Sequence, residues 1–241
     1  MGDIMNYIIS VIFLILSIAA STILPIGLCI YFNRKYEASF KAAVIGAVIF
    51  IVSQPILRFP FLKLIQGTSW FSYNSAVNPW LISIFLGFTA AIFENTGRLI
   101  AFKYFLKDKL QWKNGIAYGL GHGGIEAILI VGLPFIGLIL SNLSNLSIIN
   151  AVPIMYLVSG IERISAMTLH IATSLMVLYA VRTKKYGYFL LAILVHGIID
   201  SSIGFIKNIA VIEIWFAAFA VSLLVFIIMK IRKSSNEKIL G

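Results

Sequence analysis

Nine ionisable residues interrupt the apolar segments of this chain, and their side chains are the groups that could do chemistry. They comprise all three histidines, four carboxylates and two arginines: His122, His170, His196, Glu94, Glu126, Glu162, Asp200, Arg98 and Arg163. A charged side chain in the middle of a membrane-spanning helix costs at least about 2.5–3.5 kcal/mol on insertion scales. Residues of this kind are therefore functional candidates by default.

The spacing of these residues places several of them on shared helix faces, because side chains four residues apart are neighbours on a helix. The pairs with this spacing are Glu94 and Arg98, Tyr118 and His122, His122 and Glu126, and His196 and Asp200. At about 1.5 Å per residue, Glu94 lies roughly 18 Å from the predicted cytoplasmic end of its segment, and the histidines lie roughly 10–15 Å from theirs. The sequence therefore predicts one buried site, in the middle to cytoplasmic half of the membrane.

The charges of this site do not balance. If all are ionised, four carboxylates face two arginines, which leaves two negative charges in excess. In a low-dielectric site this excess must be reduced by protonation of a carboxylate or a histidine or by binding of a cation. A desolvated glutamate can serve as a general base, and three neutral histidines with a carboxylate form a zinc set. A purely structural interpretation treats Glu94–Arg98 and Glu162–Arg163 as ion pairs that only hold helices together.

Glycines surround His122, in the segment Gly119-Leu-Gly121-His122-Gly123-Gly124. Glycine weakens a helix, but it lets another backbone or a substrate approach closely. The sequence leaves both alternatives open.

The composition shows which elements must position these residues. The 241 residues are 60% hydrophobic and 12% charged, with a mean hydropathy of +0.99, whereas soluble domains are about 45–50% apolar and about 25% charged. This excludes a water-soluble fold. The net charge of +10 comes from short basic clusters between apolar runs, so the chain lacks the continuous basic surface of a nucleic-acid binder. The single cysteine excludes an intrachain disulfide and a cysteine-based metal cluster.

Seven segments are long and apolar enough to span a membrane, which takes about 20 residues. They are Ile4–Phe32, Ala38–Leu57, Pro79–Leu106, Gly115–Leu140, Ala151–Val181, Tyr186–Ile206 and Ile209–Ile231. The first is too long for a cleaved signal peptide and carries Asp3 in place of a basic cluster. We therefore predict an all-α, polytopic bundle that forms one membrane domain over residues 1–241, with a catalytic four-helix core at about 79–206.

The loops also predict an orientation. Fourteen lysines and arginines lie in the loops of one side and three in those of the other, and basic loops stay in the cytoplasm. The N-terminus is thus predicted outside and the C-terminus inside a bacterial cytoplasmic membrane. The aromatic-rich outer loop 58–78 is expected in the interface or folded back towards the bundle. The loop 141–150 is polar and uncharged.

The order of the motifs resembles a known group of enzymes. Glu94-x-x-x-Arg98, Tyr118-x-x-x-His122 and His196-x-x-x-Asp200 are similar to the three motifs of the CAAX-processing and bacteriocin-processing (CPBP) intramembrane proteases. The resemblance is closer still to the YhfC family of predicted bacterial intramembrane proteases. The segments that carry it are Phe93-Glu94-Asn95-Thr96-Gly97-Arg98, Gly121-His122-Gly123-Gly124-Ile125-Glu126-Ala127, Glu162-Arg163 through His170, and His196-Gly197-Ile198-Ile199-Asp200. Asn95 stands where the CPBP pattern has a second glutamate, and Asp200 stands in place of an asparagine.

The resemblance implies hydrolysis of a peptide bond inside the membrane. In the glutamate mechanism, which needs no cofactor, Glu94 and His122 would deprotonate a water molecule. His196, oriented by Asp200, would stabilise the oxyanion, and Arg98 would hold Glu94 in place. We expect a cavity open to the cytoplasm and a membrane protein, a peptide or a lipidated peptide as substrate.

A second mechanism is also compatible with these residues. A single zinc ion could be bound by His122, His170 and His196, together with Glu126, with one position left for water. The sequence slightly favours the metal-free mechanism.

Two other functions use the same residues. One is a proton- or cation-coupled transporter, in which the carboxylates and histidines would form a relay. The other is a non-enzymatic immunity or scaffold protein of the same fold. The sequence indicates neither the substrate nor the oligomeric state.

Overall fold

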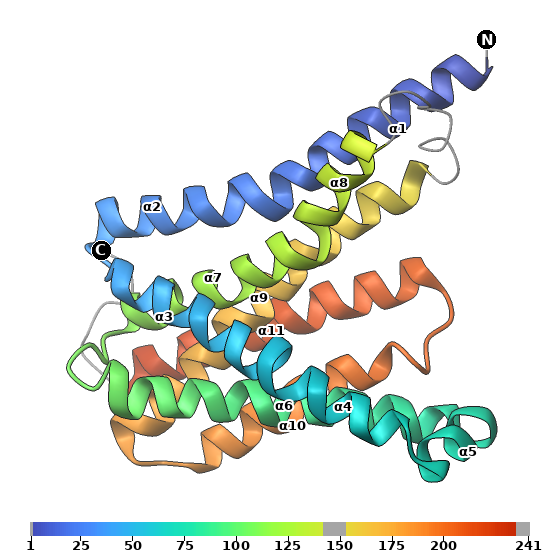
Figure 1. Cartoon of the computed structure of the whole chain (residues 1–241). Helices are drawn as coiled ribbons and strands as arrows, with labels where there is room; N and C mark the ends of the chain where they lie inside the picture. Colours follow the sequence, from blue (N-terminus) through green and yellow to red (C-terminus); the bar gives the residue numbers. More distant parts are fainter. Residues whose placement is uncertain (1, 142–152, 235–241) are drawn as a thin grey trace.

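The computed structural model describes residues 2–141 and 153–234, and within these ranges all regular elements are helices (Figure 1). The predicted all-α fold is therefore confirmed. The predicted loop 141–150 lies, apart from Ser141, outside the described residues.

The helices follow the apolar runs of the sequence, because a backbone in lipid must satisfy its own hydrogen bonds. They are α1 (Gly2–Ile18), α2 (Leu24–Tyr36), α3 (Phe40–Ile51), α4 (Phe59–Gln66), α5 (Ser69–Val77), α6 (Pro79–Ile100), α7 (Trp112–Ala127), α8 (Leu133–Ser141), α9 (Pro153–Thr183), α10 (Gly187–Ser202) and α11 (Ile209–Ser234). Three π-helical segments join consecutive helices without a break: Ala19–Ile23, Val52–Arg58 and Ile128–Gly132. A fourth, Ala101–Phe105, extends α6.

In the described part of the chain, six helical stretches are long and apolar enough to cross a membrane. They are Met5–Tyr36, Phe40–Gln66, Pro79–Phe105, Trp112–Ser141, Pro153–Thr183 and Ile209–Lys233. The sixth predicted segment instead forms α10, which ends at Ser202 and has 16 residues. At about 1.5 Å per residue, α10 is about 24 Å long, shorter than the hydrocarbon core of about 30 Å. It packs between α6 and α9.

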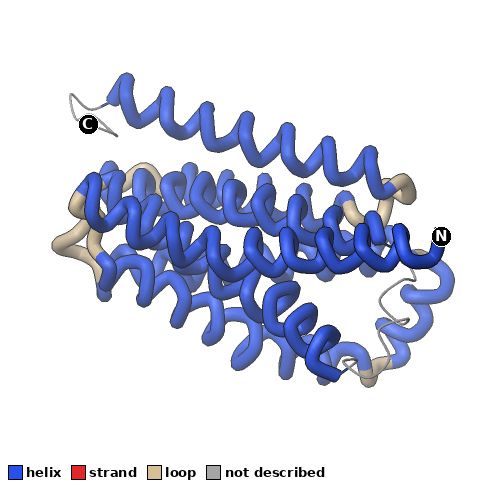
Figure 2. Tube along the Cα trace, turned by 90° about the horizontal axis from the view of Figure 1, so that it is seen from above, coloured by secondary structure: helices blue, strands red, loops and turns tan. Residues whose placement is uncertain are grey.

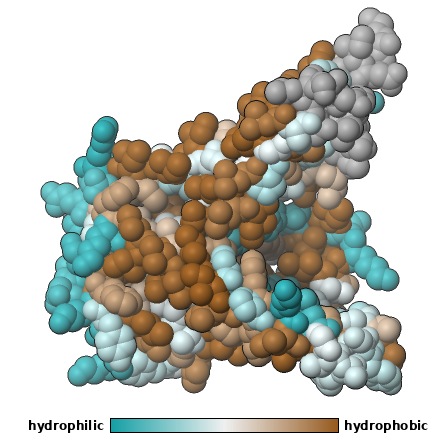
Figure 3. All heavy atoms as spheres, in the orientation of Figure 1, coloured by the Kyte–Doolittle hydropathy of each residue, from teal (hydrophilic) through white to brown (hydrophobic). Residues whose placement is uncertain are grey.

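The long helices run between two ends of the molecule (Figures 1 and 2). One end holds the connections α2–α3, α6–α7 and α9–α10 together with the end of α11, and hydrophilic residues gather there in Figure 3. We call this the basic end. The other end holds the start of α1, the helices α4 and α5, and the connection α10–α11. Successive connections thus lie at opposite ends of the molecule, as the predicted topology requires. Which end faces the cytoplasm stays a prediction.

Helix α9 is the centre of the bundle. In its most apolar stretch 78% of the residues are buried, against 22–33% in the other five spans. It packs against α1, α7, α10 and α11, whereas α11 lies along one edge of the bundle (Figure 2). The buried polar residues of α9, among them Arg163, His170 and Thr173, therefore face other helices.

The predicted outer loop 58–78 consists largely of the short helices α4 and α5. It folds back against α6, where the ring of Phe61 lies 5.7 Å from that of Phe93 and the ring of Trp70 lies 5.5 Å from that of Phe85. Of the two placements expected for this segment, the contacts with α6 support folding back towards the bundle.

Candidate active site

The structure brings the three histidines and Glu94 together from four helices, α6, α7, α9 and α10. Glu94 Oε2 lies 3.0 Å from His122 Nε2, 3.6 Å from His170 Nδ1 and 3.9 Å from His196 Nε2. None of the four residues is more than 3% exposed. The prediction that they share one buried site is confirmed.

The glycines of α7 allow this approach. A Cβ atom on Gly121 would lie 2.6 Å from the carbonyl carbon of Ala43 in α3, and one on Gly119 would lie 2.5 Å from the Cα atom of Ile171 in α9. One on Gly123 would lie 2.9 Å from the ring of His170. These contacts are the close backbone packing that small residues permit between membrane helices. The glycines around His122 therefore serve helix packing.

Arg98 is fully buried and joins Glu94 to His170. Its Nη2 atom donates to Glu94 Oε2 at 3.1 Å and lies 2.6 Å from His170 Nδ1. Since a guanidinium only donates hydrogen bonds, His170 Nδ1 must accept, and the ring proton sits on Nε2. That atom faces Glu126 Oε2 at 2.6 Å. Arg98 thus contacts Glu94 as predicted and also sets the tautomer of His170.

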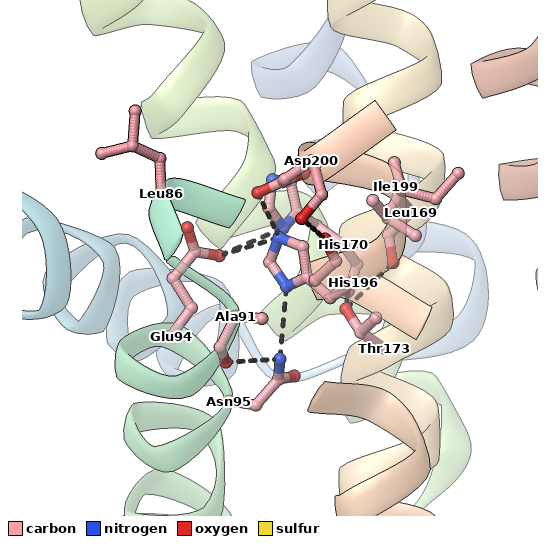
Figure 4. A network of polar contacts seen from close by, with 12 residues as sticks. Leu86, Ala91, Glu94, Asn95, Leu169, His170, Thr173, His196, Ile199 and Asp200 are labelled. Carbon is pink, nitrogen blue, oxygen red and sulfur yellow. Dashed lines mark hydrogen bonds and ion pairs between the residues drawn. The ribbon is translucent and has the colours of Figure 1, made fainter. Parts of the chain in front are cut away.

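His196 is held by a residue that sequence reasoning noted only as a departure from the CPBP pattern. Asn95 Nδ2 donates to the carbonyl of Ala91 at 2.8 Å and lies 3.2 Å from His196 Nδ1. Nδ1 therefore accepts a hydrogen bond, and the proton of His196 sits on Nε2. This atom faces Asp200 Oδ2 at 3.3 Å, and Figure 4 shows Glu94 beside the same ring.

Two residues of the site are not among the nine candidates, which were the ionisable residues within the predicted membrane segments. Gln54 donates to Glu94 Oε1 at 2.5 Å, and Arg58 donates from Nη1 to Gln54 Oε1 at 2.9 Å. Both residues lie in the π-helical segment Val52–Arg58. The signal was present, since Gln54 and Arg58 are four residues apart at the end of an apolar run. The assignment of Arg58 to an outer loop was wrong.

A second charged group adjoins the site. Arg163 donates from Nη1 to Glu126 Oε1 at 2.8 Å and also pairs with Glu162. The ion pair expected between Glu162 and Arg163 is confirmed, and Glu126 belongs to it. Because Arg58 is also present, three arginines face four carboxylates. The formal excess is one negative charge where two were expected.

A cavity of about 360 Å³ leads to this cluster. Its lining on α6 consists of Ser83, Leu86, Gly87, Ala90 and Glu94, so it extends from Glu94 away from the basic end. In Figure 3 a hollow with hydrophilic residues inside opens on an otherwise hydrophobic face.

On the other side of Glu94 the space is filled by aromatic side chains. The rings of Phe102 and Tyr118 lie 4.8 Å apart, and both residues are 0% exposed. The cavity therefore lies in the half of the bundle opposite the basic loops, so the predicted opening on the side of these loops is wrong. The predicted depth of a residue along its own helix does not show which half of the bundle contains the cavity.

The residues present fit a divalent metal ion. The ligand atoms of Glu94, His122 and His170 all lie within 4.8 Å of one another. Zinc bonds of about 2.0–2.1 Å place tetrahedral ligand atoms about 3.3 Å apart, close to the 3.0 and 3.6 Å separations of the two histidines from Glu94. Two histidines and a glutamate are one of the known catalytic zinc sets.

This set differs from the three histidines expected from sequence. Glu94 takes the place of His196 in the set. Glu126 lies at Nε2 of His170, the ring nitrogen that would not bind the metal. Metal-binding histidines commonly donate a hydrogen bond from this second nitrogen to a carboxylate. A metal at His170 Nδ1 would require Arg98 Nη2 to turn away from that atom.

Comparisons with known proteins identify the family of this chain. A family model described as "YhfC intramembrane metalloprotease" matches residues 20–221, a range that includes every residue of the cluster. The chain is 34% identical over 251 residues to "Uncharacterized membrane protein YhfC" of Bacillus subtilis (strain 168), covering 93% of this chain and 97% of that protein. No solved structure matches the chain. The protein is therefore a multi-pass membrane protein, and it belongs to the YhfC family.

Proposed function

We propose that the protein is a metal-dependent intramembrane endopeptidase that hydrolyses a peptide bond of a membrane-associated substrate. The observation that carries the proposal is the convergence of His122 Nε2 and His170 Nδ1 on Glu94 Oε2, at 3.0 and 3.6 Å. The description of the family supports it. The substrate would be a membrane protein, a peptide or a lipidated peptide.

Glu94, His122 and His170 would hold one divalent ion, and zinc suits this donor set. When bound, such an ion acts as a Lewis acid that activates water and polarises a carbonyl group. Glu126 would keep His170 oriented through its Nε2 atom.

His196 would act on the developing oxyanion. Because Nδ1 accepts from Asn95, the proton is on Nε2, and its hydrogen bond would pass from Asp200 to a substrate oxygen that binds near Glu94. A donor preorganised in a water-poor site stabilises a transition state more than the same donor does in water. Asp200, 3.3 Å from Nε2, would orient the ring before the substrate binds. Asn95 would be a positioning residue.

The metal-free glutamate mechanism has weaker support. Glu94 accepts from Gln54 on Oε1 and from Arg98 on Oε2, and His122 Nε2 lies 3.0 Å from Oε2. A carboxylate that is engaged by three groups has little capacity left to take a proton from water. The family description also names a metalloprotease and not a glutamate-type enzyme.

We keep the proposal of one membrane domain over residues 1–241, but the catalytic core must begin before residue 79. Gln54 and Arg58 contact the site from the segment that follows α3. Because the cavity lies towards the end opposite the basic loops, we propose that the substrate reaches it from that side.

The test compares membrane proteomes of cells that express the wild type, Glu94→Gln or His122→Ala at equal levels. Glu37→Gln is the matched control, because the side chain of Glu37 is 89% exposed and lies outside the site. We expect the same full-length membrane proteins to accumulate with both site variants and with neither the wild type nor the control. Cleavage of such a protein by the purified enzyme should stop with a chelator and return with zinc.

Unchanged processing in both site variants would refute the proposal. Proton or cation uptake into proteoliposomes that disappears in Glu94→Gln, without any cleavage, would replace the protease by the transporter.

A further inference from the structure

Arg58 lines the cavity, and its three hydrogen bonds all go to neutral groups. Nε donates to Thr89 Oγ1 at 3.2 Å, Nη1 to Gln54 Oε1 at 2.9 Å, and Nη2 to the carbonyl of Leu86 at 2.7 Å. The other two arginines of the site each contact a carboxylate. In the described part of the chain, no carboxylate lies within ion-pair distance of Arg58.

A cation at membrane depth without an ion-pair partner is costly, and this one is held in place by three acceptors. A guanidinium has five N–H groups, of which two are on each terminal nitrogen. Each terminal nitrogen of Arg58 therefore retains one N–H that is not used by these bonds. Two such groups can bind both oxygens of one carboxylate.

The charge of the site favours an anionic guest, an argument that rests on the proposed function. Four carboxylates and three arginines leave one negative charge in excess, and a divalent metal ion would turn this into one positive charge in excess. One further negative charge would neutralise the loaded site. Arg58 and Arg163 both line the cavity, but Arg163 is paired with Glu126 and Glu162, whereas no described carboxylate lies within ion-pair distance of Arg58.

The position of Arg58 places such an anion close to the reacting bond. Only the amide of Gln54 separates the guanidinium from Glu94. An extended peptide covers about 3.3–3.6 Å per residue, so a group at Arg58 would lie about two or three residues from a bond near Glu94. The cavity wall around Arg58 includes Phe59 and Phe216, which suit apolar neighbours in the peptide.

We propose that Arg58 binds a carboxylate of the substrate, so that the site selects peptides with a negative charge a few residues from the scissile bond. This carboxylate is either the C-terminus of the chain or an aspartate or glutamate side chain. Both present the same chemistry to the guanidinium, and the experiment separates them.

The test measures binding of three peptides, each labelled at the N-terminus with an uncharged dye of the BODIPY class, to the purified, metal-loaded full-length protein by fluorescence anisotropy. The peptides are Leu-Phe-Ala-Leu as the free acid, the same sequence as the C-terminal amide, and Leu-Phe-Ala-Asp as the C-terminal amide. His196→Ala serves as the background, to prevent turnover. Arg58→Gln, Arg58→Lys and the control Lys63→Gln, an exposed cation on the neighbouring helix α4, are introduced into it.

We expect at least one carboxylate peptide to bind about tenfold or more tightly than the uncharged amide. An advantage of the free acid alone identifies the C-terminus as the ligand, and an advantage of the aspartate peptide identifies a side chain. Arg58→Gln should remove this preference, Arg58→Lys should keep part of it, and Lys63→Gln should not change it.

Equal binding of all three peptides, including no binding of any, would overturn the proposal, as would a preference that survives in Arg58→Gln. The metal content of Arg58→Gln should equal that of the background, which shows that the site has kept its fold. Failure of the proposed function would appear instead as missing metal or missing cleavage by the protein with Arg58 intact.

Discussion

The metal site offers the sharpest test, because the structure predicts that the three histidines are not equivalent. His170 Nδ1 lies 3.6 Å from Glu94 Oε2 and belongs to the group whose ligand atoms are within 4.8 Å of one another. His196 Nε2 lies 3.9 Å from the same oxygen and is outside that group. His170→Ala should therefore remove a ligand, whereas His196→Ala should remove a neighbour of the ligands.

The expected magnitudes follow from these positions. Loss of a hydrogen-bonding partner of a ligand costs about 10–100-fold in metal affinity. Glu126→Gln, which changes the partner of His170 Nε2, should fall in this range. His170→Ala, His122→Ala and Glu94→Gln should exceed it, which corresponds to more than about 2.8 kcal/mol at about 1.4 kcal/mol per tenfold. His196→Ala should lower the affinity by less than about tenfold and still abolish cleavage.

The assay is a titration of the purified protein with zinc in competition with a chelator of known affinity, with bound metal measured by atomic emission. Glu37→Gln serves as the control for purification and for loss of a carboxylate. Thermal unfolding of each variant checks that the fold survives. If His196→Ala weakens zinc binding as much as His170→Ala does, His196 is a ligand and its exclusion from the set is wrong; if Glu94→Gln binds zinc like the wild type, the assignment of Glu94 as a ligand is wrong. If His170→Ala binds zinc like the wild type, the group does not hold the metal.

Three further predictions concern packing, access and orientation. Gly121→Ala should lower the midpoint of thermal unfolding of the purified protein, because the new Cβ atom would lie within 3.0 Å of the α3 backbone. Gly137→Ala is the control and should not change the midpoint, since no atom lies within 4 Å of its Cβ position. Equal midpoints for the two variants would contradict the packing argument. In a Cys29→Ala background, Ser83→Cys should react with a membrane-impermeant maleimide added to intact cells, since Ser83 lines the cavity on the predicted outer side; labelling only after permeabilisation would place the opening on the cytoplasmic side. Asn95→Leu should lower kcat without loss of bound metal, because the neighbouring imidazole loses the donor that fixes its tautomer; an unchanged kcat would show that this hydrogen bond does not position the ring.

Much of the site could be predicted from local rules. The lengths of the apolar runs predicted the helices, and the four-residue spacing of Glu94 with Arg98 predicted the buried ion pair that the structure shows at 3.1 Å. The costs of charges in lipid singled out the histidines and carboxylates as members of one cluster. These inferences succeeded because helical periodicity and membrane depth are set by the chain itself.

Other features were not accessible in this way. Gln54 was overlooked because a single uncharged amide in an apolar run carries little signal, and Arg58 was placed in a loop because the helix continues through a π-helical segment beyond the expected boundary. The direction of the cavity was wrong because depth along one helix does not show where aromatic side chains such as Tyr118 fill the space between helices.

By itself, the sequence determined that this protein is a helical membrane protein with acids, imidazoles and guanidinium groups at one depth. The packing of the helices brings particular members of this set together: Glu94 is shared by His122 and His170, and Arg58 lines the cavity. The physical reason is that residue spacing sets the face and height of a side chain on its own helix. The rotation of one helix against another depends on contacts such as that of Gly121 with Ala43, which no single segment contains.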